Sequence, residues 1–262
     1  MCGIVAVIGS RAAAPLLLKG LKSLEYRGYD SAGIATVKTS SKGLKGSLTC
    51  QRAKGKLENL VKLVDKQGAP GLLGIGHTRW ATHGNPEQRN AHPHRDSSGA
   101  LAVVQNGIIE NHSSLRKELQ LQGVKFVSET DTEVIPHLIA RELNVLKSDG
   151  QRVSEGLLLD AVRKVSLQLE GAYAIAVVWE EVPEALVVAR RQAPLLIGLG
   201  EGEFLCASDT AALAGFTRTI LPLEDGEVAL LTPLGIELYD DRGKRQQRSP
   251  LLLNGQAEVV TK

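Results

Sequence analysis

A cysteine at the second position of the chain is the first candidate for chemistry. The N-terminus reads MCGIVAVIG, so Cys2 directly precedes a short apolar run that predicts a buried strand. If Met1 is removed, Cys2 carries a nucleophilic thiol and a free α-amine, which titrates near ~7.7–8.0 and can accept a proton near neutral pH. The alternative is a small apolar residue that only packs at the start of a strand. The position of Cys2 alone favours the packing role, so other residues of the chain must decide between the two roles.

The dipeptide Asn106-Gly107, in the stretch QNGIIEN, is a candidate oxyanion hole. The Asn side-chain amide and the Gly backbone N–H are two neutral donors that can stabilise a tetrahedral oxyanion. The same dipeptide is also a strong signal for a type I′ hairpin turn, which is the alternative. Because apolar residues continue without alternation through Ile108 and Ile109, a simple exposed turn is the less convincing of the two.

Two charged residues suit the recognition of a free amino acid. Arg79, in HTRWATHG, follows a predicted strand, and its planar guanidinium can hold a carboxylate through two parallel hydrogen bonds. A surface ion pair is its alternative role. Asp131, in SETDTEV, lies where a helix is predicted to start, so it is either an N-cap or a partner for an ammonium group. With a thiol and an oxyanion hole, these residues are the parts needed to bind an amino acid and attack its side-chain amide.

The histidines are clustered in the sequence. His77, His83, His92 and His94 lie in or next to residues 80–99, a long stretch without a clear period that we expect to be functional. A metal cluster is the minority interpretation, because no HExxH or Cys/His spacing supports it. We therefore expect neither a metal nor a cofactor.

Composition excludes several classes of protein. Lys and Arg number 31 against 29 Asp and Glu, which leaves a net charge of +2, and only 3% of residues are aromatic. A general nucleic-acid binder is therefore not expected. No apolar stretch approaches the ~20 residues of a membrane span, and the N-terminus lacks the charged segment of a signal peptide. Three widely spaced cysteines argue against a disulfide framework. We expect a cytoplasmic protein without membrane contact.

The pattern of elements predicts an α+β fold. Helical periodicity covers residues 14–25, 55–67, 113–123, 131–146 and 154–171, and the fourth of these opens with a capping-box arrangement of Thr130 and Glu133. Predicted strands come in adjacent pairs, which is typical of antiparallel sheets covered by helices. Residues 1–240 are predicted to form one domain, and residues 241–262 a linker or tail.

A series of motifs in register from residue 1 to about 240 carries a family resemblance. In chain order they are MCGIV, LEYRGYDSAG, GHTRWATHG, NAHPH, NGIIENH and SETDTEVIPHL. The sequence resembles the class II glutamine amidotransferases, which are N-terminal-nucleophile (Ntn) hydrolases, and in particular the glutaminase domains of glutamine–fructose-6-phosphate aminotransferases. That resemblance implies a four-layer αββα sandwich of two antiparallel sheets. YRGYDSAG and RWATHG favour this branch over its sibling, the glutaminase domain of amidophosphoribosyltransferases.

The resemblance also implies a role for each matching residue. Cys2 would be the nucleophile with its own amine as base, and Asn106 and Gly107 would hold the oxyanion. The implied substrate-binding residues are Arg79 for the carboxylate, Asp131 for the ammonium group, and Thr82 and His83 in the pocket wall. Two supporting roles are also implied: Trp80 would help to gate the passage of ammonia, and Arg27 would support the nucleophile. One departure is Gln105, which stands where many relatives have His and leaves the hydrogen bonding beside the oxyanion hole open.

The implied reaction is hydrolysis of L-glutamine to glutamate and ammonia for glucosamine 6-phosphate synthesis. The implied partners are two sugar-isomerase domains that bind fructose 6-phosphate, and the isolated domain is expected to be monomeric. Two alternatives remain open at this point: an Ntn amidase acting on another amide, and a non-catalytic amino-acid-binding module in which Cys2 only packs.

Overall fold

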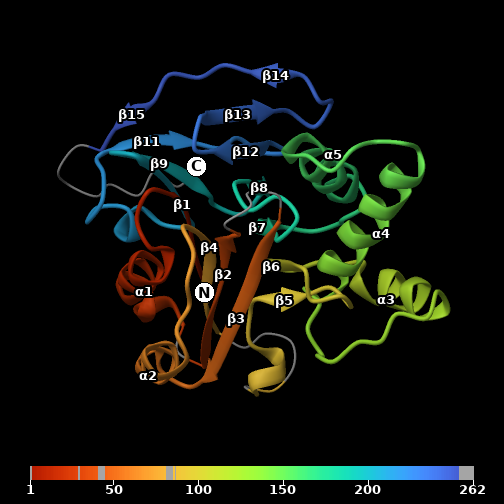
Figure 1. Cartoon of the computed structure of the whole chain (residues 1–262), viewed down its shortest axis with the longest axis horizontal. Coiled ribbons are helices and arrows are strands. Elements are labelled where there is room, and N and C mark those ends of the chain that lie inside the picture. The colour runs from red at the N-terminus through yellow and green to blue at the C-terminus, as the bar shows by residue number, and fades with distance from the viewer. Residues whose placement is uncertain (1, 29, 41–44, 81–84, 86, 254–262) are drawn as a thin grey trace.

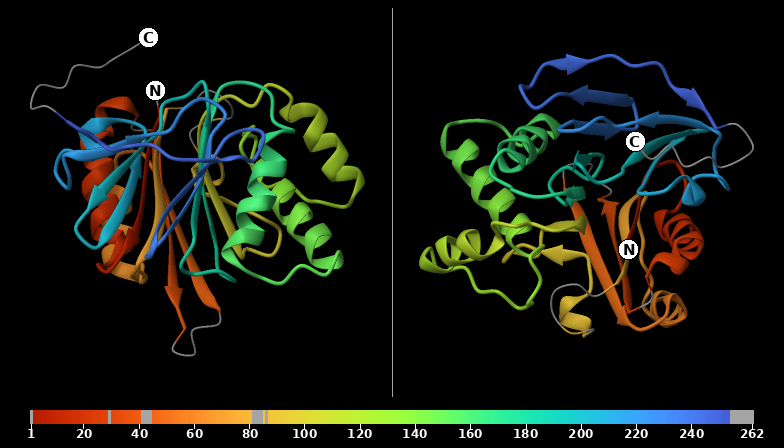
Figure 2. Two further views of the ribbon diagram at one scale, coloured as in Figure 1. Left: turned by 90° about the horizontal axis from the view of Figure 1, so that it is seen from above. Right: turned by 180° about the vertical axis from the view of Figure 1, so that it is seen from behind.

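Two antiparallel β-sheets pack face to face, and helices cover the outer face of each (Figures 1 and 2). The computed structural model describes residues 2–28, 30–40, 45–80, 85 and 87–253. The α+β class and the four-layer αββα arrangement predicted from the sequence are confirmed.

The first sheet contains the N-terminal strand. Its order within the described residues is β15-β11-β9-β10-β1-β4-β2-β3. The bounds are β1 Gly3–Gly9, β2 Ser31–Thr39, β3 Gly46–Lys54, β4 Leu73–Arg79, β9 Leu196–Gly200, β10 Glu203–Ala207, β11 Thr219–Pro222 and β15 Leu251–Leu252. Strand β1 pairs with β4 on one side and with β10 on the other, so the start of the chain is hydrogen-bonded along both edges.

The second sheet is built from the middle and the end of the chain. Its order is β14-β13-β12-β8-β7-β6-β5. The bounds are β5 His94–Arg95, β6 Leu101–Gly107, β7 Tyr173–Trp179, β8 Leu186–Arg191, β12 Val228–Thr232, β13 Gly235–Tyr239 and β14 Arg245–Gln246. Strands β6, β7 and β8 are apolar on both faces, because one face meets the first sheet and the other meets the helices.

The helices form the two outer layers. Helices α1 (Ala13–Ser23) and α2 (Leu57–Gln67) cover the first sheet, whereas α3 (His112–Leu121), α4 (Val134–Ser148) and α5 (Glu155–Ser166) cover the second (Figure 2). In α1, Leu17 and Leu21 are four residues apart and fully buried against the sheet. Each such burial stabilises the fold by roughly 1.5–3 kcal/mol. Within the described residues, no helix is long and apolar enough to cross a membrane.

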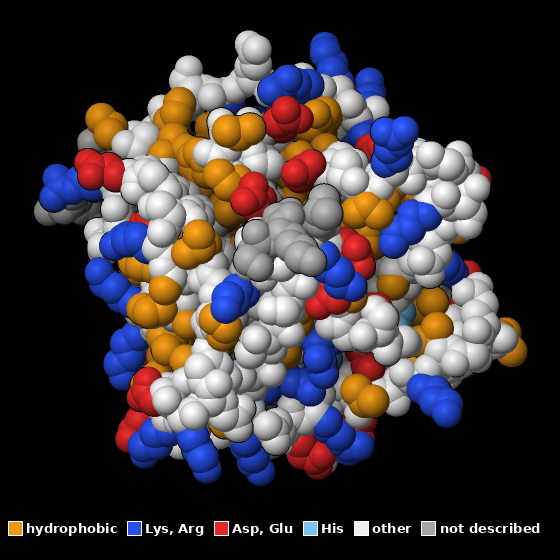
Figure 3. Space-filling view, viewed as in Figure 1, with side chains coloured by type: hydrophobic (Ala, Val, Ile, Leu, Met, Phe, Trp, Pro, Cys, Tyr) orange, Lys and Arg blue, Asp and Glu red, His pale blue; other side chains and the backbone are white. Residues whose placement is uncertain are grey.

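The surface shows no broad region of one charge on the face in Figure 3. Basic and acidic side chains are interspersed there, with apolar side chains between them. This distribution agrees with the small net charge of the chain.

Two helix ends differ from the sequence prediction. Helix α4 begins at Val134, and the predicted capping box is wrong: the Glu133 carboxylate accepts hydrogen bonds from the backbone N–H groups of Val127 (2.9 Å) and Ser128 (2.7 Å) instead. Helix α5 ends at Ser166 rather than at Gly171. Gly171 has a φ of 108° and closely approaches the Ile108 carbonyl, so its role is a tight backbone crossing rather than a helix stop.

The described part of residues 241–253 lies against both sheets. Strand β14 pairs with β13 in the second sheet, and β15 pairs with β11 in the first, so the segment crosses from one sheet to the other (Figure 1). Between them, the Arg248 guanidinium binds the buried Glu227 carboxylate through two hydrogen bonds of 2.8 and 2.7 Å. A boundary at residue 240 and a linker role stay predictions.

The Arg248–Glu227 pair predicts a stability effect. Replacing Arg248 by Ala leaves a buried carboxylate without its cation, so we expect the free energy of unfolding to fall by roughly 1–3 kcal/mol. Urea unfolding measures this change. Arg245→Ala is the matched control, because Arg245 and Glu237 are both exposed and 3.4 Å apart, and it should change stability by less than ~0.5 kcal/mol. Equal effects of the two substitutions would contradict the assignment.

Candidate active site

The Cys2 thiol is held by the backbone at the end of β4. The Trp80 N–H donates to Cys2 Sγ at 3.3 Å, and Sγ lies 3.5 Å from the Trp80 carbonyl oxygen. The residue is half-buried and stands directly before β1. Burial raises the pKa of the Cys2 thiol, whereas the Trp80 hydrogen bond and the Arg79 charge act against this rise. Because the thiol is then protonated near neutral pH, a nearby base is needed to generate the thiolate.

Asn106 contacts Cys2, which is 104 residues away in the sequence, and Gly107 follows Asn106 in β6. The Asn106 side-chain nitrogen donates to the Cys2 carbonyl oxygen at 3.2 Å. Both residues belong to β6 and pair with Ala174 and Tyr173 of β7, so the type I′ turn alternative is wrong. Gly107 has a φ of 97°, and a Cβ there would lie 2.0 Å from the Ala172 oxygen. Only glycine fits this position without strain.

Arg79 and Asp131 are charged residues that the fold buries. Their exposed fractions are 3% and 5%. The surface ion pair considered for Arg79 is therefore wrong, and burial lowers the pKa of its guanidinium. Asp131 is not an N-cap, because α4 begins after Glu133; its Oδ2 accepts a hydrogen bond of 2.8 Å from the Ile109 N–H, just beyond the Asn106-Gly107 pair. The Arg79 charge lowers the pKa of the Cys2 thiol, and the Asp131 charge raises it.

Arg27 reaches the start of β1 through a neighbouring loop. Its Nη1 lies 3.0 Å from the Asp209 carboxylate and donates to the Ser208 carbonyl at 3.3 Å. Ser208 in turn bonds to both backbone groups of Ile4, at 3.0 and 3.1 Å. This chain of contacts fits the predicted support of the nucleophile. Sequence reasoning missed Ser208 and Asp209, which carry no motif of their own.

Three predicted site residues remain: Trp80, Thr82 and His83. Trp80 is 45% exposed beside Cys2. Thr82 and His83 lie outside the described residues.

Three of the clustered histidines meet in the interior. The rings of His77 and His92 stack with centroids 4.1 Å apart, and His94 contacts His92 edge-on at 4.8 Å. Burial lowers the pKa of His77 and of His94 to about 3, so both are neutral at physiological pH. No group of three or more His, Cys, Asp or Glu side chains within the described residues is arranged to hold a metal ion.

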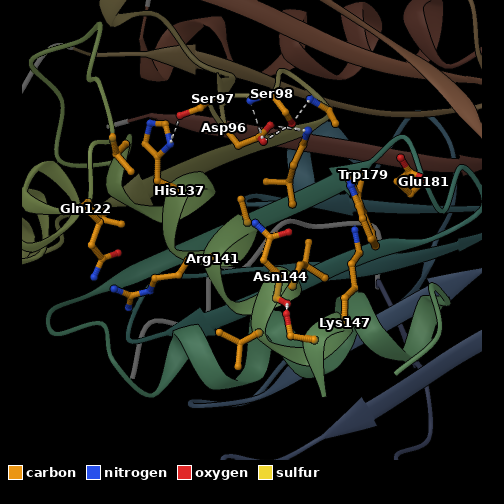
Figure 4. Close-up of a pocket in the computed structure, with 18 of the residues that line it drawn as sticks. Asp96, Ser97, Ser98, Gln122, His137, Arg141, Asn144, Lys147, Trp179 and Glu181 are labelled. Carbon is orange, nitrogen blue, oxygen red and sulfur yellow. Dashed lines mark hydrogen bonds between the residues drawn. The ribbon is translucent and has the colours of Figure 1, made fainter. Parts of the chain in front are cut away.

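A cavity of about 650 Å³, whose lining includes none of these three histidines, lies between α3, α4 and the turn at residues 96–98 (Figure 4). His137 and Arg141 from α4 and Trp179 from β7 line it. Its lining includes none of the predicted site residues. We therefore take the surroundings of Cys2, rather than this cavity, as the candidate active site.

The chain was compared with known proteins. Residues 77–215, more than half of the chain, match the family described as glutamine amidotransferase domain. The fold and the match define the class: the chain belongs to the glutamine amidotransferase domain family, with the Ntn-hydrolase architecture.

Particular relatives carry a more specific name. The chain is 57% identical to the glutamine–fructose-6-phosphate aminotransferase [isomerizing] of Thermosynechococcus vestitus and 54% identical to that of Synechocystis sp.. Each match covers all of this chain and 40% of the relative, so the chain spans about two fifths of their length. Among solved structures, the glutamine phosphoribosylpyrophosphate amidotransferase from B. subtilis has a TM-score of 0.75 and 28% identity, over 92% of this chain and 49% of that one.

The close approach at Gly107 predicts a position-specific cost. Gly107→Ala introduces a Cβ against the Ala172 carbonyl at positive φ, so we expect the free energy of unfolding to fall by roughly 1–3 kcal/mol. Gly123→Ala is the matched control: it also has a positive φ, 87°, but no atom lies within 4 Å of its Cβ position, and it should cost only about 1 kcal/mol. Denaturant unfolding of both variants measures the difference, and the crowding argument fails if they are equally stable.

Proposed function

We propose that this chain hydrolyses L-glutamine to glutamate and ammonia, with Cys2 as the nucleophile once Met1 is removed. The observation that carries the proposal is the hydrogen bond between the Asn106 amide and the Cys2 carbonyl, which supports Asn106 as an oxyanion-hole donor because it sets this amide beside the residue that carries the thiol. Membership of the glutamine amidotransferase family supports the choice of substrate.

The proposed reaction has two halves. The α-amine of Cys2 takes the thiol proton, and the sulfur attacks the amide carbon of glutamine. The Asn106 amide and the Gly107 N–H stabilise the oxyanion. The tetrahedral intermediate then collapses: the protonated amine gives its proton to the amide nitrogen, the C–N bond breaks, and ammonia leaves. Water, deprotonated by the same amine, then attacks the thioester. The sulfur leaves, regains a proton, and glutamate is released.

We assign the orientation of the substrate to two buried charged side chains. Arg79 binds the α-carboxylate and Asp131 the α-ammonium group. Both side chains are almost fully buried, where an ionic contact is stronger than in water. Thr82 and His83 stay predicted pocket residues, Trp80 a predicted gate for ammonia, and Arg27 a predicted support. We expect no cofactor or metal.

The whole protein is proposed to use the ammonia for glucosamine 6-phosphate synthesis. Relatives named glutamine–fructose-6-phosphate aminotransferase [isomerizing] extend well beyond the matched region, which supports sugar-isomerase domains that bind fructose 6-phosphate as partners. A domain end near residue 240 stays a prediction. The amidophosphoribosyltransferase branch is the second candidate. Identity of 57% against 28% favours the first. A cytoplasmic location and a monomeric isolated domain stay predictions.

Loss of the nucleophile is the central test. We expect Cys2→Ala to lower glutamate release at least about 10³-fold, because thioester formation is then impossible. Cys50→Ala, which removes another half-buried thiol, should keep full activity. A coupled glutamate assay is combined with an intact-mass measurement. Glutamate release by a chain that retains Met1 would contradict the N-terminal-amine mechanism, and full activity of Cys2→Ala would favour the binding-module alternative.

The assigned role of Asp131 predicts a change in specificity. We expect the intact protein to prefer glutamine over glutaramate, which lacks the α-amine, and Asp131→Asn to lose most of this preference. The variant keeps an oxygen for the Ile109 N–H, while the fall in kcat/KM for glutamine should be roughly 30-fold or more, as for loss of a buried charge partner. Glu129→Gln, on the same loop but exposed, is the control. An unchanged preference in Asp131→Asn would remove the assignment.

A further inference from the structure

The two ends of the Asn106 side-chain amide are distinguished by their neighbours. Its Nδ2 lies 3.2 Å from the Cys2 carbonyl oxygen, and its Oδ1 lies 3.0 Å from His77 Nε2. A carbonyl oxygen only accepts hydrogen bonds, so the amide end that faces Cys2 must be the NH₂ group. The other end is then the oxygen, and His77 Nε2 must carry a proton and donate it.

His77 is suited to hold one defined proton. It lies in β4 of the first sheet, is fully buried, and faces Asn106 of the second sheet across the interior. Burial lowers the pKa of His77 to about 3, so the ring is neutral and has a single N–H. The bond to Asn106 assigns this N–H to Nε2.

His92 keeps the His77 ring in place. The two rings stack at 4.1 Å with an angle of 19° between their planes. His92 is itself fixed: its Nδ1 accepts the Gln105 backbone N–H at 3.3 Å, which leaves the proton on Nε2, 3.3 Å from Thr132 Oγ1. The Thr132 hydroxyl donates to Gln105 Oε1 at 2.6 Å. His92, the stacking partner of His77, is thus hydrogen-bonded to β6, the strand that carries Asn106, and to Thr132, the residue after Asp131.

We propose that His77 is a positioning residue of the oxyanion hole: its Nε2–H holds the Asn106 amide with the NH₂ group toward Cys2, where the oxyanion forms. This inference rests on the proposed glutaminase activity. Without the His77 donor, Asn106 Oδ1 loses its partner and only the bond from Nδ2 to the Cys2 carbonyl still orients the amide, so an amide rotated by 180° becomes more populated. A rotated amide presents an oxygen to the developing negative charge, which repels the oxyanion instead of stabilising it.

Substitutions at His77 separate positioning from packing. A glutamine can place its amide nitrogen near the position of Nε2, an asparagine near that of Nδ1, and a leucine fills the volume without a donor. We expect His77→Leu and His77→Asn to lower kcat for glutamate release about 10²–10³-fold, as for loss of one oxyanion donor, with KM changed less than about threefold. His77→Gln should restore most of the loss.

A double-mutant cycle with Asn106→Ala supplies the second readout. Because His77 acts through Asn106, His77→Leu should lower kcat little further once Asn106 is already Ala. Thermal unfolding is followed for every variant. Should His77→Leu fail to fold, the His77→Gln and His77→Asn pair carries the same comparison.

The outcomes separate this inference from the proposed function. Normal kcat in folded His77→Leu or His77→Asn would overturn the positioning role, as would equal losses in His77→Gln and His77→Asn. Losses that multiply fully in the double variant would also overturn it. Absence of glutamate release from the unsubstituted, processed chain would overturn the proposed function, and the inference with it.

Discussion

The site depends on β1 being the hydrogen-bonded interior strand of a sheet. Chain ends normally fray, because few contacts hold them. Here the strand that follows Cys2 pairs with β4 and β10, and Ile4 and Val5 are fully buried on opposite faces. The thiol therefore inherits the rigidity of the sheet, and the end of β4 can hold it through the Trp80 backbone. A terminal amine can serve as a base only if it is positioned in this way.

The packing of one sheet on the other completes the site. Cys2, His77 and Arg79 come from the first sheet, whereas Asn106 and Gly107 come from the second, and the apolar layer between the sheets sets their separation. The His77–Asn106 hydrogen bond crosses this layer. Polar groups buried in such a layer are costly unless they are paired, so this contact makes the relative position of the sheets specific as well as stable.

Much of the fold could be predicted, because its signals are local. Leucine spacing predicted α1, and adjacent pairs of apolar runs predicted antiparallel strands. The position of Cys2 and the Asn106-Gly107 dipeptide indicated chemistry before any contact was known. The wrong predictions concern residues whose partners depend on the path of the chain around them, whether those partners are near or far in sequence. Glu133 caps the backbone at Val127 and Ser128 instead of closing a capping box with Thr130, a choice that depends on the path of the preceding loop.

The sequence by itself determined the class of elements, the candidate nucleophile and the residues suited to bind an amino acid, since these follow from residue type and short-range spacing. Only the tertiary structure decided which of them meet. In the folded chain, Asp131 accepts a hydrogen bond from the Ile109 N–H instead of capping a helix. Strands β14 and β15 join two different sheets, and His77 contacts Asn106. The physical reason is that strand pairing and sheet packing join residues far apart in the chain, and no local pattern encodes the partner.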